Sequence, residues 1–200
     1  YRHMDVWLER HDNTVIVRAE QEEGLSQRLT RLFRTEHPKA DLVIDVPTHC
    51  EINAKTITGQ LDVEGIQAPV TGRVITGQLK LSDIDGPIYA KTITGKLHYA
   101  GNLSEENHRF ETITGAVQLT LPSTTNTTLS ASTVTGKIHC RLPLEKVRRQ
   151  QRFVGGKVQG TLGTGAGRIK VKITTGNLLL KPIEEKQSVP IAPIPKPVPA

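Results

Sequence analysis

The feature that most constrains this chain is a short motif that recurs at a nearly constant spacing. Thr-Ile-Thr-Gly occurs at residues 56–59, 92–95 and 112–115, and close variants occur at 74–77, 133–136 and 173–176. The motif glycines are 18 to 21 residues apart, except for a last gap of 40 that predicts a degenerate repeat at Phe153–Val158. Seven such repeats are expected to form one structural unit each and to stack on one another.

Each repeat has the pattern of two short strands. Apolar residues stand seven and five positions before the glycine, and again two and four positions after it, with the period of two that is typical of a strand. The residue two positions before the glycine is also expected to point inward; these residues are Ile57, Ile75, Ile93, Ile113, Val134, Val154 and Thr174. The parity differs between the two strands, so the chain should turn a corner just before the motif. The glycines are expected where backbone approaches closely.

A two-stranded unit of about 20 residues cannot bury its own apolar face, so we predict an all-β, single-domain β-solenoid of about seven rungs of 18–21 residues. Residues 1–50 are expected to form a capping hairpin that turns at Asp12-Asn13, followed by a first rung over Asp41–Pro47. Residues 25–36 fit either a short helix or a strand. Residues 51–181 form the rungs, and the proline-rich residues 182–200 form a disordered tail or linker.

Composition narrows the possibilities further. Hydrophobic residues make up 36% of the chain and aromatic residues 4%, which argues against a leucine-rich helical bundle. No apolar run approaches the ~20 residues that span a bilayer, so we expect no transmembrane segment in this chain. The net charge is +6, and residues 146–172 hold eight basic residues and no acidic one. The excess positive charge is therefore a local property of the surface.

Lysine and arginine recur four positions before and one position after the motif glycine, at positions expected to face solvent. The candidate partner surface consists of Lys55, Arg73, Lys91, Lys96, Lys137, Arg152, Lys157 and Lys172. A strip of this kind suits an anionic polysaccharide or a cell-envelope polymer. Nucleic acid is disfavoured as a partner, because no aromatic residues interleave to stack on bases. The alternative is a solvated sheet face whose lysines prevent unwanted strand pairing.

The threonines of the motif are expected to point outward in two rows. This threonine ladder consists of Thr56, Thr58, Thr76, Thr92, Thr94, Thr112, Thr114, Thr133, Thr135 and Thr175. Regular Thr-x-Thr rows resemble the ice-binding face of insect antifreeze proteins. Threonine also suits a half-exposed strand, where stacked hydroxyls bond along the ladder, so its role is expected to be mainly structural.

No group of residues in the sequence indicates catalysis. His98 and His139 share a column but should lie two rungs apart, roughly 10 Å, which is too far to share a metal ion. Cys50 and Cys140 should lie roughly 20 Å apart, too far for a disulfide. We therefore expect no catalytic, metal-binding or cofactor-binding residues and no cofactor.

The successive Thr-Ile-Thr-Gly-x-Leu-x-Val units, preceded by the strand-like Asp41–Pro47, resemble a bacterial β-strand-repeat family of adhesins that is otherwise a domain of unknown function. The resemblance covers residues 5–182. It implies a non-enzymatic solenoid that serves as a scaffold or binding module at the cell surface or envelope. The alternatives are a self-associating rod, comparable to the bacterial cytoskeletal solenoids, and, more remotely, an ice-binding protein.

Overall fold

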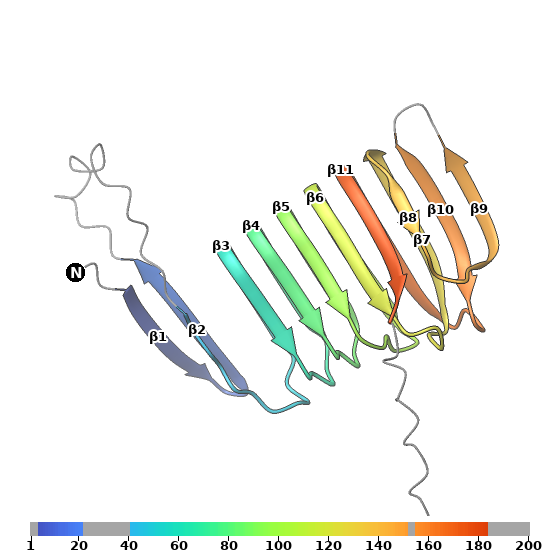
Figure 1. Cartoon of the computed structure of the whole chain (residues 1–200). Helices are drawn as coiled ribbons and strands as arrows, with labels where there is room; N and C mark the ends of the chain where they lie inside the picture. Colours follow the sequence, from blue (N-terminus) through green and yellow to red (C-terminus); the bar gives the residue numbers. More distant parts are fainter. Residues whose placement is uncertain (1–3, 22–40, 152–154, 184–200) are drawn as a thin grey trace, which may run out of the picture. The chain divides into compact units, whose positions relative to one another are not determined.

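The computed structural model describes residues 4–21, 41–151 and 155–183 (Figure 1). It divides the chain into two compact units, Tyr1–Asp45 and Val46–Ala200. The predicted degenerate-repeat residues Phe153 and Val154, the helix-or-strand segment 25–36 and most of the tail lie outside the described residues. All regular structure in the described part is β-strand, and none of it is a helix that could span a membrane.

The first unit contains the predicted hairpin. Strand β1 (Met4–His11) pairs antiparallel with β2 (Thr14–Gln21) in continuous register. The turn lies at Asp12-Asn13, and Asp12 has a positive φ of 49°. Aspartate and asparagine tolerate this left-handed conformation better than most residues. The prediction of the hairpin and of its turn is confirmed.

The described residues of the second unit form one nine-stranded sheet. Its strands are β3 (Ile52–Glu64), β4 (Val70–Ser82), β5 (Ile88–Ala100), β6 (Asn107–Leu121), β7 (Thr127–Thr135), β8 (Ile138–Cys140), β9 (Glu145–Gln151), β10 (Gly156–Leu162) and β11 (Gly167–Pro182). The order is β3-β4-β5-β6-β11-β7-β10-β9, and β8 pairs with β11. Figure 1 shows the long strands side by side.

Equivalent residues of successive repeats lie next to one another. β3, β4, β5 and β6 pair in parallel, with Gly59 beside Gly77, Gly77 beside Gly95, and Gly95 beside Gly115. The connecting turns stack in the same way, since the Gln67 amide donates to the Thr48 carbonyl and the Asp85 amide to the Ile66 carbonyl. The predicted in-register stacking of repeats is confirmed for these four strands.

The order of strands departs from the sequence order after β6. β11, which carries the last motif, lies between β6 and β7 and pairs in parallel with both. The 40-residue gap between Gly136 and Gly176 therefore is not two parallel repeats. It contains β9 and β10, which pair antiparallel with each other, and β10 also runs antiparallel to β7. A parallel rung at Phe153–Val158 is thus a wrong prediction; this segment lacks both motif threonines, and its described end begins β10 instead.

The predicted first rung is also absent. Residues 41–46 form no strand, and Leu42, Val43 and Ile44 are exposed by 49%, 85% and 51%. Only the turn that follows is in place, where the Cys50 amide donates to the Pro47 carbonyl. In the described structure β3 is therefore the first strand of the sheet.

Five columns of inward side chains make up most of the core, and residues of the connections such as Ile66, Ile84 and Leu103 complete it. The columns seven, five and three positions before the glycine are buried, as are those two and four positions after it. In β4 these residues are Val70, Gly72, Val74, Leu79 and Leu81. Tyr99 and Phe110 are the largest fully buried side chains of the core, with ring centroids 5.7 Å apart. Four of the five columns agree with the alternation of the sequence; the third does not.

The residues expected to be inward two positions before the glycine point outward instead. The exposed fractions are 72% for Ile57, 45% for Ile75, 38% for Ile93, 44% for Ile113 and 63% for Val134. Thr92, Thr112 and Thr133, one residue earlier, are buried. The reason is that the alternation of inward and outward side chains shifts by one residue inside the motif. In β4, for example, the consecutive residues Ile75 and Thr76 are both exposed, and the next buried residue is Leu79.

The glycine column lies at this corner, and its backbone requires glycine. Gly77, Gly95, Gly115 and Gly176 have φ between 137° and 148°, a conformation that residues with a Cβ rarely adopt. A Cβ on Gly95 would lie 1.8 Å from the Gly77 carbonyl oxygen, and the equivalent contact recurs along the column. The predicted close approach of backbone at these glycines is confirmed.

Candidate functional site

Cationic side chains follow one another across the sheet in a single row. Register pairs join, in order, Lys55, Arg73, Lys91, Glu111, Lys172, Ser132 and Lys157. We call the five cations of this series the cation row. Adjacent strands are about 4.8 Å apart, so its ends are separated by roughly 29 Å. Lys55, Arg73, Lys91 and Lys172 each stand four residues before a motif glycine, whereas Lys157 reaches the row through the antiparallel pairing of β10 with β7. The row joins β3, β4, β5, β11 and β10.

The one acidic member of the series is compensated by its neighbours. The Arg109 Nε donates to Glu111 Oε1 at 2.7 Å, and the Tyr89 hydroxyl donates to Glu111 Oε2 at 3.4 Å. The guanidinium groups of Arg73 and Arg109 lie 5.5 and 5.6 Å from the centroid of the Tyr89 ring. Cations over an aromatic face are attracted by its electron density. This cluster offsets the negative charge of Glu111, so the series stays predominantly positive.

An exposed apolar row lies beside the cation row on the same outward face. It consists of Ile57, Ile75, Ile93, Ile113 and Val134, two residues further along each strand, with Thr174 of β11 between the last two. A shallow hollow of about 240 Å³ lies between the two rows near Lys91, Ile113 and Val134. Contiguous exposed apolar side chains are typical of interaction surfaces. The alternation of the sequence predicts these residues to lie in the core, so this part of the surface was not foreseen.

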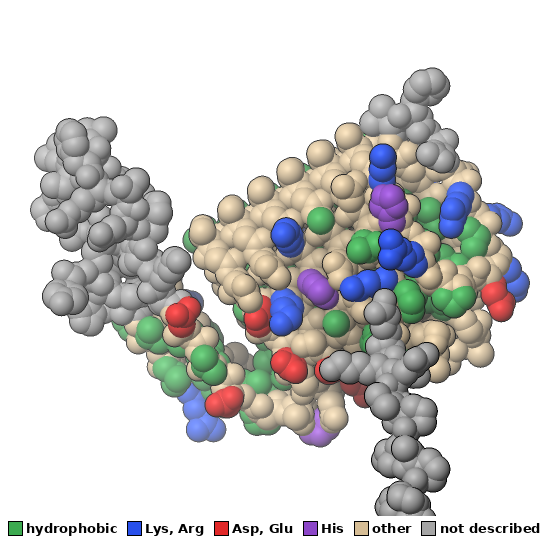
Figure 2. All heavy atoms as spheres, viewed as in Figure 1, with side chains coloured by type: hydrophobic (Ala, Val, Ile, Leu, Met, Phe, Trp, Pro, Cys, Tyr) green, Lys and Arg blue, Asp and Glu red, His purple; other side chains and the backbone are tan. Residues whose placement is uncertain are grey.

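The remaining predicted cations are not in the row. Lys96 and Lys137 each stand one residue after a motif glycine, five positions further along the chain than the register position of the row. The Lys137 amide donates to the Asn177 side chain at 3.0 Å. Arg152 is outside the described residues. On the face seen in Figure 2, lysine and arginine side chains gather toward the end of the sheet that holds β7, β9 and β10, as the local basicity of the sequence predicts.

The threonine ladder is divided between core and surface. Thr58, Thr76, Thr94, Thr114, Thr135 and Thr175 form one exposed row at the corner. Thr92, Thr112 and Thr133 are buried, and Thr56 is half-buried. The predicted pairs of outward threonines are therefore wrong, because the parity change lies within the motif. The regular Thr-x-Thr face on which an ice-binding function depends does not form.

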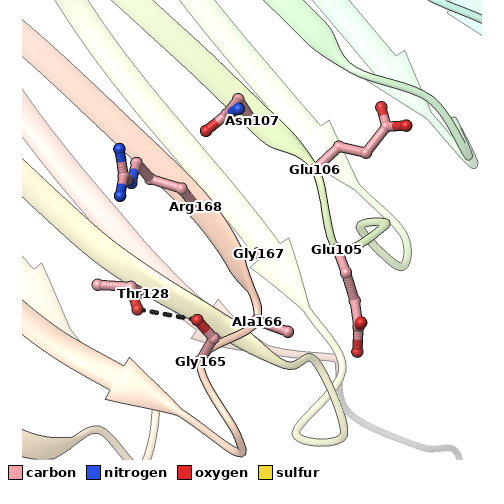
Figure 3. A pocket seen from close by; sticks show the side chains of 8 residues that line it. All are labelled: Glu105, Glu106, Asn107, Thr128, Gly165, Ala166, Gly167 and Arg168. Atoms are coloured by element: carbon pink, nitrogen blue, oxygen red, sulfur yellow. Dashed lines mark hydrogen bonds between the residues drawn. The ribbon is translucent and has the colours of Figure 1, made fainter.

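A polar hollow of about 230 Å³ lies at the turns that precede β6 and β11 (Figure 3). Its lining includes Glu105, Glu106 and Arg168, and the Thr128 hydroxyl donates to the Gly165 carbonyl at 3.1 Å across it. The carboxylates of Glu105 and Glu106 point in different directions in Figure 3, so they do not converge on one ligand. In the described part of the chain, no three histidine, cysteine or acidic side chains cluster as metal ligands would.

The histidines and cysteines are dispersed. Three strand steps separate His98 from His139, since β11 lies between β6 and β8, and the distance of roughly 14 Å exceeds the predicted 10 Å. Burial lowers the pKa of His98, and the charges of Lys181 and Lys80 lower it further. Cys50 and Cys140 are both free thiols, and burial raises the pKa of the Cys140 thiol. None of these groups is placed for nucleophilic or metal chemistry.

One buried histidine was not identified from the sequence. His108 of β6 occupies the core column between Ile88 and Ile169, and only 1% of it is exposed. Its Nε2 lies 2.9 Å from the Ser104 carbonyl oxygen, and its Nδ1 has no partner. Burial lowers the pKa of His108. The neutral ring therefore belongs to the core.

The fold can be compared with known proteins. The model of the family described as Toastrack DUF4097 matches residues 11–181, which include β2 and every copy of the motif. This match confirms the resemblance of the repeats to a β-rich family of unknown function. No curated protein and no solved structure matches the chain.

Proposed function

The chain belongs to the toastrack family, and from that premise we propose that it is a non-enzymatic binding module built on a β-solenoid scaffold. Its function is to present the cation row and the adjoining apolar row to an anionic polysaccharide or cell-envelope polymer. The cell surface or envelope is the corresponding location.

The solenoid part of the proposal is supported by the corner in each long strand. The motif glycine of each long strand has a positive φ, and buried columns continue both before and after it. The turns between strands stack in register as well as the strands do. Stacked repeats whose like residues form a continuous core are characteristic of solenoids.

The observation that carries the binding proposal is the in-register cation row. Five Lys and Arg residues occupy five of seven successive register positions, with Glu111 and Ser132 in the other two, and present a line of positive charge that suits a long anionic polymer. Exposed lysines also protect sheets from aggregation, but protection needs no apolar row beside them. The exposed isoleucines offer a surface on which the less polar parts of a bound polymer can pack. Together the two rows suit a ligand that is both anionic and long.

This proposal can be tested with two probes, dextran sulfate and uncharged dextran of the same length. We expect the full chain to bind dextran sulfate and not dextran, and the affinity to fall as salt is added, because exposed charges are screened over about 10 Å at 0.1 M salt. Arg73→Glu should weaken binding while leaving the circular dichroism spectrum unchanged. Equal binding of both dextrans, or binding that is insensitive to salt, would contradict the proposal.

The self-associating rod remains the alternative prediction and is less well supported. A head-to-tail rod needs two ends that continue the same parallel pairing. One end of the sheet is β3, which carries the motif, whereas the other is β9, an antiparallel strand without it. The two described ends therefore do not match as successive rungs would.

A further inference from the structure

The outer edge of β3 is a long strand edge without a partner among the described residues. β3 has 13 residues and ends the sheet order, with β4 as its one neighbour there (Figure 1). The consequences are visible in its core columns: Ile52, Leu61 and Val63 are half-buried, whereas Val70, Leu79 and Leu81 of β4 are exposed by 1% or less. A Cβ on Gly59 would meet nothing within 4 Å. An open edge of this kind is a template for pairing with another chain.

A second copy fits this edge only in certain registers. A two-fold axis through the corner of β3 would run the two edges antiparallel and exchange their arms. Residues that point into the core on one copy must then lie opposite residues that point into the core on the other. Inward residues of β3 have even numbers before Gly59 and odd numbers after it, so only registers that pair an even-numbered with an odd-numbered residue satisfy this condition. In the register centred between Thr58 and Gly59, Ala54 lies opposite Val63, and Thr56 lies opposite Leu61. All four belong to the inward columns.

The charges of β3 favour that same register. It places Lys55 of one copy opposite Asp62 of the other, and the symmetry forms this pair twice. Both side chains are exposed in the single chain. Moving the centre one residue toward the N-terminus would instead place Glu51 opposite Glu64, and moving it one residue toward the C-terminus would place Ile57 opposite Asp62. Opposite charges on facing residues stabilise a strand pair, whereas like charges destabilise it.

We propose that β3 pairs antiparallel with β3 of a second copy of this chain, with Lys55 facing Asp62 across the two-fold axis. The pairing completes the hydrogen bonds of the open edge and covers the half-buried core columns. It goes beyond the binding function proposed above and does not depend on it. Because a two-fold contact uses the same surface on both partners, it closes a dimer and does not propagate a rod.

The test is sedimentation equilibrium of the full chain over a range of concentrations, with charge-swapped variants. We expect the wild-type chain to dimerise. Lys55→Glu and Asp62→Lys should each weaken dimerisation by at least about tenfold, because each turns two attractive pairs into repulsive ones. The double variant Lys55→Glu/Asp62→Lys should regain most of the affinity. Lys91→Glu, in the same column of the interior strand β5, serves as the control and should leave dimerisation unchanged.

Three results would overturn the inference. The first is a wild-type chain that stays monomeric at every concentration. The second is a dimer that the single charge reversals leave unaffected. The third is a dimer that the single variants weaken and the double variant fails to restore, which would exclude this register. A chain that does not bind dextran sulfate can still dimerise through β3. The dimer proposal and the binding proposal can therefore each be contradicted without the other.

Discussion

Replacing Gly95 with alanine tests why the motif ends in glycine. Gly95 has a φ of 138°, and a Cβ there would lie 1.8 Å from the carbonyl oxygen of Gly77. A Cβ essentially never comes within 3.0 Å of a heavy atom outside its own residue and its chain neighbours. The alanine side chain of Gly95→Ala must therefore push the neighbouring strand β4 away. Two costs therefore add: the backbone strain of a residue with a Cβ and the disruption of the packed corner.

The chain offers a matched control that separates the two costs. Gly59 has nearly the same backbone conformation, with a φ of 129°, but a Cβ added to it would meet no atom within 4 Å. Gly59→Ala should lose only the strain, about 1–3 kcal/mol. Gly95→Ala should lose a further ~1–3 kcal/mol, the usual cost of overpacking a well-packed site.

Urea unfolding of dilute protein, followed by circular dichroism, measures the difference. With an m-value of about 2 kcal/mol/M, a difference of about 2 kcal/mol separates the two midpoints by about 1 M. The Gly95→Ala midpoint should be the lower one. Equal midpoints for the two variants would refute the close-approach argument and would leave strain as the sole reason for the glycine column.

Two further predictions concern buried polar groups. Thr92 is fully buried and its hydroxyl has no hydrogen-bond partner, while the equivalent residue of β4 is Val74. Thr92→Val should therefore raise the free energy of unfolding by about 1 kcal/mol. Thr94→Val, at an exposed position, should change it little. A loss of stability in Thr92→Val would contradict the conclusion that the Thr92 hydroxyl is buried without a partner. Burial lowers the pKa of His108 in the folded chain, so the unfolded chain binds the proton more readily, and stability should decrease as the pH falls below about 6.5. The slope of unfolding free energy against pH in this range should be smaller in His108→Gln, and an unchanged slope would assign the effect to other groups.

Much of the fold could be predicted because the repeat is visible both in the spacing of the glycines and in the alternation of apolar residues. The spacing of the glycines predicted the parallel in-register pairing of β3, β4, β5 and β6, although not the single continuous strand that each repeat forms, and alternation identified four of the five core columns. The parity change inside the motif could not be read directly, since isoleucine favours burial and an unpartnered buried threonine is costly. A signal was nonetheless present: position three before the glycine holds Val74 and Ile173, and position two before it holds Thr174.

The strand order after β6 had no such signal. A gap of 40 residues equals two repeats in length, so spacing alone cannot distinguish two more rungs from a hairpin followed by a returning strand. The loss of both threonines near residue 155 was the one local sign that β10 differs. The candidate surface was likewise half predicted: the lysines follow from the repeat, but the isoleucines beside them depend on the corner geometry.

Strand β5 allows the most direct test of the proposed binding function. Lys91 belongs to the cation row, and Lys96 lies on the same strand beyond the corner. Both variants, Lys91→Glu and Lys96→Glu, change the net charge by the same amount, so they differ only in which surface they alter. The affinity of each for dextran sulfate is the quantity to measure. We predict that Lys91→Glu weakens binding by about tenfold, or about 1.4 kcal/mol, and that Lys96→Glu has a much smaller effect. Equal losses in the two variants would show that net charge and not the row is responsible, and would contradict the proposal.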